Sequence, residues 1–342
     1  MLTNAWYCAA WSRELGTSSM LRRKLLNLHV LIARDKQGHV HALRAVCPHR
    51  GADLSRGRLL ENSIECPVHG WRFDMDGRCV EIPSQPPAAK IPPQACVSAY
   101  PAREQQGIIW LWLGRRSGAL PDPPWHQELD TPLRARRRLC APQLWQASFI
   151  NVVENAIDLT HLPYVHGSVL GRRGRHAFFN AQPRIDNDLR GFSGEDSAQQ
   201  PWDSFRLADV ASGPLGRLAS ALLGIGTIGR ERYRFNLGGS LLYKIEWQSG
   251  TWDAFIAHAT PADDTHTWFF GMSVRTRAIN PIGDLCQAWF DRKLCQDDRR
   301  QVSAMLSTDP NLLHDPISVV GDDPMLAFRR IYKHQMSLDK AR

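Results

Sequence analysis

The chain of 342 residues lacks the features of a secreted or membrane-spanning protein. It opens without the basic stretch and apolar run that a secretory signal peptide needs. Its most apolar later segment, residues 215–228, is interrupted by glycines and Arg217 and is too short to cross a bilayer. The eight cysteines are scattered and form no disulfide framework, which fits a reducing compartment. We therefore expect a cytoplasmic protein with no membrane span.

Two further absences restrict the function. No glycine-rich fingerprint follows a predicted strand, so the chain is not expected to bind a dinucleotide itself. No basic platform with interleaved aromatic residues is present, which argues against nucleic-acid binding. The net charge of +8 is moderate, with basic runs at 22–24, 134–138 and 172–175. These runs are either solvated surface or a docking face for an acidic partner protein.

The length predicts two domains, each large enough to bury its own core. Residues 1–116 read as all-β: β-prone runs at 26–32, 39–46 and 107–113 accompany a hairpin that turns at Asp76-Gly77. A small β-sandwich is expected. Residues 117–140 are rich in proline and arginine and are predicted to be a linker.

Residues 141–342 form the predicted second domain and mix helical and strand patterns. Helices are expected near 148–162 and 284–306, with a polar tail behind the second one. Strands are expected at 232–236, 240–247, 253–260 and 267–276, which makes this an α+β domain. The run 213–223 is either a lid over a substrate or a core helix. Trp252, Phe255 and Met272 are expected in the core.

The most informative pattern is Cys47-x-His49, sixteen residues, then Cys66-x-x-His69. Two thiolates and two imidazoles suit a two-iron, two-sulfur cluster in which one iron takes the cysteines and the other the histidines. A Cys2His2 zinc site is the alternative metal interpretation, but zinc fingers pair cysteine with cysteine and histidine with histidine. The remaining alternative is four unrelated residues.

This pattern resembles the Rieske family, whose ligands match the four residues one for one. The respiratory-complex branch of that family carries an additional cysteine beside each ligand pair, where this chain has Ala52 and Pro67. The resemblance is therefore to the Rieske domain of oxygenases and their ferredoxins, and it implies a [2Fe-2S] cluster.

A second pattern, Asp158-x-x-His161-x4-His166, lies on the predicted helix. On an ideal helix the two histidines would lie about 140° apart around the axis, so they could not share a metal. Pro163 is expected to break or kink the helix and bring His166 back. Two imidazoles and one carboxylate make the facial triad of non-haem iron(II) enzymes. From the residues alone, core histidines remain the alternative.

This second pattern resembles the mononuclear-iron motif of the Rieske non-haem iron oxygenases, which implies that His161 and His166 bind Fe(II). The resemblance places the third ligand on a C-terminal helix, and residues 296–300 match that patch. Asp298 is favoured because Val302 supplies the expected apolar residue four positions later. Asp297 is the alternative, and Asp291 is a more distant one.

The resemblance covers essentially the whole chain and is strongest to the vanillate O-demethylase group of α-only oxygenases. It implies an N-terminal all-β Rieske domain and an α+β, helix-grip-like catalytic domain. It also implies a homotrimer in which the cluster of one subunit lies beside the iron of the next. Asp158 would then connect His161 to His69 of the partner subunit, and Asn155 would lie near the iron.

The implied function is that of a terminal oxygenase acting with O2 on an aromatic or other cyclic small molecule. Electrons would come from a separate reductase or ferredoxin, which would also carry the NAD(P)H and flavin sites. A monooxygenase is expected, with hydroxylation or oxidative O- or N-demethylation as the outcome. A ring-dihydroxylating dioxygenase, an amine N-oxygenase and a Rieske electron carrier with an inactive second site are the alternatives.

Overall fold

The computed structural model describes residues 1–342 apart from 87, 116–117, 131–134, 167–181, 198–227, 306–316, 320 and 342. The chain divides into two compact units. The N-terminal unit comprises Thr3–Pro123 with Thr260–Asp264, and the C-terminal unit comprises Met1–Leu2, Pro124–Ala259 and Thr265–Arg342. The domain bounds 1–116, 117–140 and 141–342 stay a prediction. Among the described helices, none has the length and apolar character needed to span a membrane.

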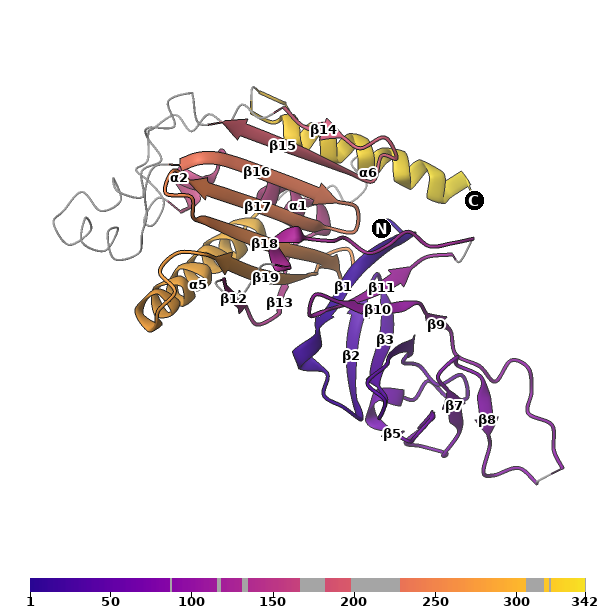
Figure 1. Cartoon of the computed structure of the whole chain (residues 1–342). Helices are drawn as coiled ribbons and strands as arrows, with labels where there is room; N and C mark the ends of the chain where they lie inside the picture. The colour runs from indigo at the N-terminus through magenta and orange to yellow at the C-terminus, as the bar shows by residue number, and fades with distance from the viewer. Residues whose placement is uncertain are drawn as a thin grey trace. The chain divides into compact units, whose positions relative to one another are not determined.

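The N-terminal unit is built from short strands in three sheets (Figure 1). The sheets have the strand orders β1-β11-β10, β2-β3-β4-β9 and β5-β6-β7-β8. The strand bounds are β1 Ala5–Trp11, β2 Ser19–Leu25, β3 Leu28–Arg34, β4 Val40–Arg44, β5 Arg58–Leu59, β6 Ser63–Glu65, β7 Arg72–Asp74, β8 Cys79–Glu81, β9 Ala99–Tyr100, β10 Ala102–Gln105 and β11 Ile108–Leu113. Single 3-10 turns lie at η1 Ser12–Glu14 and η2 Leu54–Arg56. The all-β prediction for this part is confirmed.

Burial of apolar strands holds this unit together. All six residues of β11 are buried, as the unbroken apolar run 108–113 predicts. The predicted hairpin forms between β7 and β8, and Gly77 at its turn has φ of 86°. A Cβ there would lie 2.1 Å from the Val97 carbonyl oxygen, so the turn requires glycine. One core cluster contains Leu31, Phe73 and both motif cysteines.

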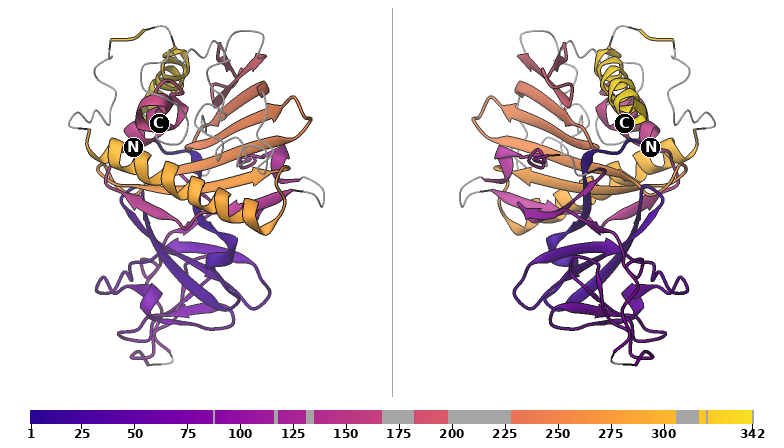
Figure 2. Two further views of the ribbon diagram at one scale, coloured as in Figure 1. Left: turned by 90° about the vertical axis from the view of Figure 1, so that its left-hand side faces the viewer. Right: turned by 90° about the vertical axis from the view of Figure 1, so that its right-hand side faces the viewer.

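The C-terminal unit contains an eight-stranded sheet. Its order is β12-β19-β18-β17-β16-β15-β14, and β13 also pairs with β19. The elements are η3 Gln127–Leu129, β12 Arg136–Leu139, β13 Gln143–Trp145, α1 Phe149–Ile157, α2 Leu162–Val165, β14 Arg184–Ile185, β15 Gly191–Ser197, β16 Ile228–Asn236, β17 Ser240–Trp247, β18 Trp252–Pro261, β19 Thr267–Arg275, α5 Pro281–Ser303 and α6 Asp323–Ala341. The predicted α+β class is confirmed. Figures 1 and 2 show α1 and α6 on the same face of the sheet, and α1 contacts both α5 and α6.

The four predicted strands appear as β16 to β19. In β16, Glu231, Tyr233 and Phe235 are buried while the residues between them are partly exposed, so one face of the strand points inward. β16, β17 and β18 pair antiparallel in sequence order. Residues that alternate along one strand therefore meet their counterparts on the next strand on the same face of the sheet.

The helices differ from the prediction in two places. The helix expected over 148–162 ends at Ile157, and a separate short helix, α2, follows a turn. The prediction of a polar tail after α5 is wrong for residues 323–341, because these residues form the helix α6. Phe328 and Ile331 of α6 are fully buried. Such residues recur at helical spacing because one stripe of the helix covers the core.

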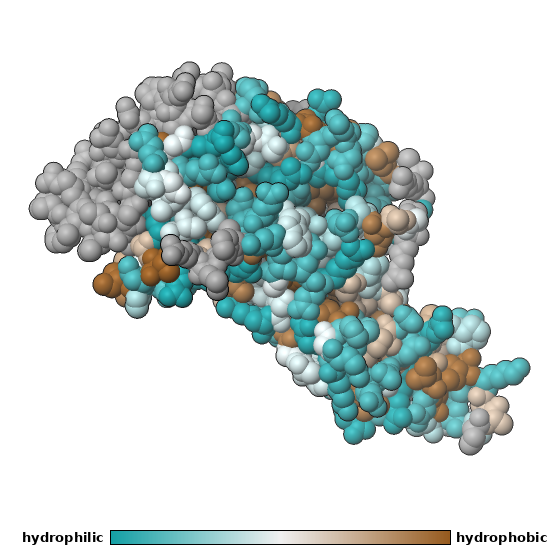
Figure 3. All heavy atoms as spheres, viewed as in Figure 1, coloured by the Kyte–Doolittle hydropathy of each residue, from teal (hydrophilic) through white to brown (hydrophobic). Residues whose placement is uncertain are grey.

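The first turns of α5 expose apolar side chains. Ile282, Leu285 and Trp289 recur at helical spacing and are 65%, 73% and 60% exposed. Figure 3 shows brown, hydrophobic atoms over this end of α5. The segment 213–223, interpreted as a lid or a core helix, and the basic run 172–175 lie outside the described residues.

Candidate functional site

Two similar loops carry the Cys/His motif in the N-terminal unit. In the first, the amide of Gly51 donates to the Cys47 carbonyl over 2.9 Å, and in the second the amide of Gly70 donates to the Cys66 carbonyl over 3.1 Å. The two glycines have φ of 72° and 68°, a backbone region that glycine adopts without strain. Each loop therefore reverses direction just after it has presented one cysteine and one histidine.

The side chains of the two loops separate by type. Cys47 and Cys66 are each 2% exposed, whereas His49 and His69 are exposed with ring centroids 4.5 Å apart. Burial raises the pKa of the Cys47 thiol to about 11. A bound iron would favour the thiolate, since metal-bound thiols are deprotonated. Two buried sulfurs below two adjacent imidazoles fit the donor set of a Rieske [2Fe-2S] cluster. Trp71 stacks on the His49 ring at 4.6 Å.

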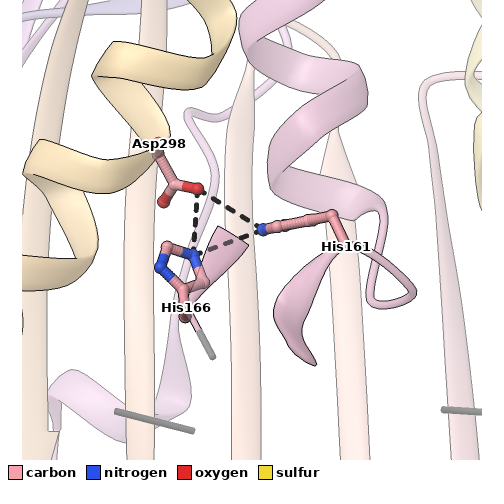
Figure 4. A group of neighbouring side chains, drawn as sticks. All are labelled: His161, His166 and Asp298. Atoms are coloured by element: carbon pink, nitrogen blue, oxygen red, sulfur yellow. Dashed lines mark hydrogen bonds and ion pairs between the residues drawn. The ribbon is translucent and has the colours of Figure 1, made fainter. Parts of the chain in front are cut away.

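A second group of side chains meets in the C-terminal unit, where His161, His166 and Asp298 converge (Figure 4). Asp298 Oδ1 lies 3.0 Å from His166 Nε2 and 3.4 Å from His161 Nε2. The two Nε2 atoms are 3.4 Å apart. One donor atom from each residue lies within 4.8 Å of the other two. Two imidazoles and a carboxylate at these separations fit a divalent iron ion.

The chain brings the two histidines together through a break between α1 and α2. α1 begins at an N-cap, where Ser148 Oγ accepts from the Asn151 amide over 3.2 Å, and Asp158 caps its C-terminus. The break therefore precedes His161, and Pro163 is the second residue of α2. His166 lies beside His161, as expected. The helix is interrupted at Asp158, however, five residues before Pro163 rather than at the proline.

The three candidate carboxylates on α5 have different environments. Asp298 faces both histidines, while Asp297 is held by Lys293 Nζ at 2.6 Å from each carboxylate oxygen. Asp291 accepts hydrogen bonds from Ser273 Oγ and Gln287 Nε2, each over 2.7 Å. Asp297 Oδ2 also lies 3.8 Å from His166 Nδ1, but of the three carboxylates Asp298 is the one that contacts both histidines.

The two acid–base partners of this site have strongly shifted pKa values. Burial alone would raise the pKa of Asp298, but the bonds to His161 and His166 outweigh it and hold that pKa well below its usual range. Burial would lower the pKa of His161, but Asp158 and Asp298 raise it to about 9. Asp298 and His161 thus stabilise each other's charged forms.

Residues around the three side chains restrain them. Asn155 Nδ2 donates to Asp298 Oδ1 over 3.0 Å. Asp158 Oδ1 accepts from the amide and the hydroxyl of Thr160 over 2.7 and 2.6 Å. Asp158 Oδ2 lies 3.7 Å from His161 Nδ1, an ion-pair separation longer than a hydrogen bond. Asn155, predicted near the iron, thus contacts Asp298, and Asp158, predicted to contact His161, lies beside that ring.

A cavity of about 210 Å³ opens beside this group in the C-terminal unit. An engineered apolar cavity of about 150 Å³ in another protein binds benzene, so this volume suits one substituted ring. The walls are mostly aromatic and aliphatic, and they include Trp145, Tyr233, Tyr243, Trp247, Phe269 and Phe290. Phe255 also lines the cavity, so its assignment to the core was wrong. Met272 is fully buried, as expected.

The sequence reading missed the polar residues of the cavity. Glu231, Asp253 and Arg277 line it. Asp253 lies in a predicted strand, whereas Glu231 precedes the predicted range 232–236 and Arg277 follows the end of β19. The signal was present in β16, where Glu231 occupies an inward position of the alternating pattern. A charged residue at such a position is an exception that marks a functional candidate.

The comparisons with known proteins agree with both parts of this arrangement. Residues 5–101 match the model of the Rieske [2Fe-2S] domain, and residues 145–336 match that of the vanillate O-demethylase oxygenase C-terminal domain. The second match covers more than half of the chain. The chain therefore belongs to the vanillate O-demethylase oxygenase family of Rieske non-haem iron proteins, as the resemblance implied.

Relatives and solved structures extend this result. The chain is 37% identical over 195 residues to the toluene-4-sulfonate monooxygenase system iron-sulfur subunit TsaM1 of Comamonas testosteroni, covering 56% of this chain and 53% of the relative. It is 33% identical over 191 residues to the oxygenase component of chloroacetanilide N-alkylformylase from Rhizorhabdus wittichii, covering 54% and 51%. These alignments thus span about half of each relative. Dicamba monooxygenase bound to dicamba shares the fold, with a TM-score of 0.77, 24% identity and coverage of 100% and 99%.

Proposed function

We propose that this chain is the terminal oxygenase component of a multi-protein system that hydroxylates an aromatic or other cyclic small molecule. The observation that carries the proposal is the convergence of His161, His166 and Asp298 on one side of an apolar cavity. The same chain contains a Rieske [2Fe-2S] domain, which supplies the electron carrier that such chemistry needs.

In this proposal the metal ligands are divided between the two units. Cys47, His49, Cys66 and His69 hold the [2Fe-2S] cluster, and His161, His166 and Asp298 hold Fe(II). When bound, iron at the second site supplies the activation of O2 for oxidation of the substrate, with the cluster as the source of electrons.

The other residues of the site orient the proposed iron ligands and restrict their movement. The amide of Asn155 keeps Asp298 turned toward the two histidines, since it donates to the same carboxylate oxygen that lies closest to both. Asp158 keeps the His161 ring in place from the opposite side. The aromatic walls keep water from the ring of the substrate and select flat, apolar molecules.

The proposed partners follow from the absence of a dinucleotide fingerprint in the sequence. A separate reductase or ferredoxin, carrying NAD(P)H and flavin sites, delivers the electrons. The basic run at 22–24 lends little support to docking at that place, because Arg22 lies 3.4 Å from Asp53 and Lys24 lies 2.8 Å from Asp263. Charges that are already compensated attract an acidic partner only weakly.

The proposed assembly is a homotrimer in the cytoplasm, in which Asp158 connects His161 to His69 of the partner subunit. The exposed apolar stripe on α5 supports contact with another chain, because monomeric proteins rarely expose a continuous apolar patch. The proposed reaction is a monooxygenation, either hydroxylation or oxidative demethylation. The relatives named above include a monooxygenase system subunit and the oxygenase component of an N-alkylformylase.

Metal and sulfide analysis tests this proposal directly. Protein purified without oxygen should contain about three irons and two acid-labile sulfides per chain, as one two-iron cluster and one mononuclear iron require. His161→Ala should lose one iron and keep both sulfides. Two irons per chain in the wild-type protein after iron supplementation would instead favour the electron-carrier alternative.

A further inference from the structure

The register of three neighbouring strands places two carboxylates on the inner face of the large sheet. Glu231 of β16 pairs with Ile245 of β17, which in turn pairs with Asp253 of β18. Directly paired residues point to the same face, so the two acids flank Ile245. With strands about 4.8 Å apart, the backbones of the two acids are roughly 10 Å from each other. All three residues line the cavity.

Asp253 is fixed in place through one of its two oxygens. Its Oδ2 accepts from Arg277 Nε over 2.5 Å and from Trp247 Nε1 over 3.0 Å. The guanidinium of Arg277 also lies over the Trp247 ring, 5.3 Å from its centroid. Two donors and a stacked ring therefore define how this carboxylate is turned.

The other oxygen of Asp253 is buried and has no hydrogen-bond partner in the described chain. Burial raises the pKa of Asp253, although Arg277 and Trp247 act in the opposite direction. Leaving a buried acceptor unsatisfied is unfavourable, and the loss is larger for a charged group. A ligand that brings a donor to Oδ1 would remove this penalty.

Glu231 provides a second acceptor on the same face. It is 5% exposed, and its Oε1 accepts from the Tyr243 hydroxyl over 2.5 Å. Tyr243 lines the cavity and belongs to the middle strand of the three. The polar end of the cavity is therefore defined by carboxylate oxygens held in fixed orientations.

The arginines of the cavity wall do not make an anion site. Arg234 Nη2 lies 3.1 Å from Asp186, and Arg275 pairs with Asp284 and with backbone carbonyls. Arg277 is the arginine that pairs with Asp253. Each guanidinium of the wall thus already has a carboxylate partner, so a carboxylate or sulfonate on the ligand would meet acidic groups without a free cation.

We propose that Asp253 determines substrate class: the cavity selects cyclic molecules that carry an O–H or N–H donor, and disfavours those that carry an acidic group. This inference rests on the proposed function for the identity of the cavity as the substrate site. The donor binds to Asp253 Oδ1, and the carbon to be oxidised faces His161, His166 and Asp298.

Four probes with one methoxybenzene core test the inference by binding alone. They are methoxybenzene, 4-methoxyphenol, 4-methoxybenzylamine and 4-methoxybenzoate. Dissociation constants are measured by isothermal titration calorimetry on the full-length protein with its metals, without oxygen. We expect the phenol and the amine to bind about tenfold or more tightly than methoxybenzene, as a hydrogen bond to a charged group implies. The benzoate should bind most weakly.

The substitution Asp253→Asn sharpens the test. The donors Arg277 Nε and Trp247 Nε1 keep an amide oxygen at the position of Oδ2, so the amide nitrogen takes the position of Oδ1. A donor then replaces the acceptor. The protonated 4-methoxybenzylamine can only donate, so its preference over methoxybenzene should disappear, whereas the phenol oxygen could still accept from the amide. Asp263→Asn is the matched control, because Asp263 also pairs with a cation, Lys24, and neither residue lines the cavity. It should keep the wild-type ranking.

The outcomes separate the two proposals. The inference about Asp253 is wrong if the wild-type protein binds the phenol and methoxybenzene alike, or binds none of the probes. It is also wrong if Asp253→Asn keeps the preference for the amine over methoxybenzene. The wild-type ranking decides this even if the variant does not fold. A donor preference in a protein with only two irons per chain would sustain the inference and refute the oxygenase proposal. Three irons per chain without a donor preference would support the oxygenase proposal and refute the inference about Asp253.

Discussion

Asn155 Nδ2 donates a hydrogen bond to Asp298 Oδ1 over 3.0 Å, joining α1 to α5 across 143 positions of sequence. The same oxygen is the atom nearest to both histidines. Asn155 is 8% exposed, so its bond to Asp298 is shielded from water. The orientation of the carboxylate is therefore set by a residue on the helix that precedes the histidines.

Loss of this hydrogen bond should weaken iron binding. In Asn155→Ala we expect the affinity of the mononuclear site for Fe(II) to fall roughly 10- to 100-fold, the usual effect of removing a group that orients a metal ligand. Iron retained per chain is measured after dialysis against graded concentrations of a chelator. Asn151→Ala, one turn earlier on α1, is the control and should retain iron like the wild type. Equal retention in Asn155→Ala would exclude the orienting role.

The neighbouring aspartates of α5 should behave differently. Asp298→Ala should lose the mononuclear iron while both acid-labile sulfides remain, because it removes one of the three converging donors. Asp297→Ala should keep all three irons, since Asp297 is paired with Lys293. Iron by mass spectrometry and sulfide by colorimetry check both variants. Loss of iron only in Asp297→Ala would transfer the ligand role to Asp297.

Asp158→Asn should separate metal binding from electron transfer. The amide keeps the size of the side chain but lacks the charge that lies 3.7 Å from His161 Nδ1. We expect three irons per chain and a rate of cluster reoxidation that falls roughly 10- to 100-fold. The rate is followed as the return of visible absorbance when prereduced protein is mixed with O2 and a turnover substrate. Thr160→Ala, which removes only the hydroxyl donor to Asp158, should have a smaller effect. A wild-type rate in Asp158→Asn would refute the connecting role.

A buried histidine outside the site should make stability depend on pH. His126 is 1% exposed, and burial lowers its pKa to about 4. The unfolded chain binds a proton near pH 6.5 while the folded chain does not, so stability is complete above pH 6.5 and falls as the pH drops toward 4. Its contribution between pH 6.5 and 5 is about 2 kcal/mol.

Urea unfolding, followed by tryptophan fluorescence at pH 7 and pH 5, checks this expectation. His126→Gln should lose less stability than the wild type between the two pH values, because glutamine does not titrate. His29→Gln, at an exposed position, should lose as much as the wild type. Identical losses in all three proteins would show that His126 does not control the dependence.

Several features of the protein follow from the sequence because their residues are near one another along the chain. The Cys/His pairs, the Asp158–His161–His166 spacing and the turn at Gly77 depend on local backbone geometry. The strands of the large sheet follow from alternation within each strand, as in β16. The helix α6 also has apolar residues at helical spacing, at 327, 328, 331 and 332, and these residues are buried. Their spacing predicts a helix where a polar tail was expected.

What only the tertiary structure decided is which distant residues meet. Adjacent residues on a helix point about 100° apart, so the facing side chain at 297 or 298 depends on how α5 is rotated against α1. Where α1 ends, at Ile157 with Asp158 as its C-cap and five residues before Pro163, was also decided by the tertiary structure. The pairing of Glu231, Ile245 and Asp253 depends on strand register, which a one-residue slip would reverse. Spacing along the chain therefore predicted the two Cys/His and His/Asp groups, whereas packing and register decided which carboxylate faces the histidines and where the polar end of the cavity lies.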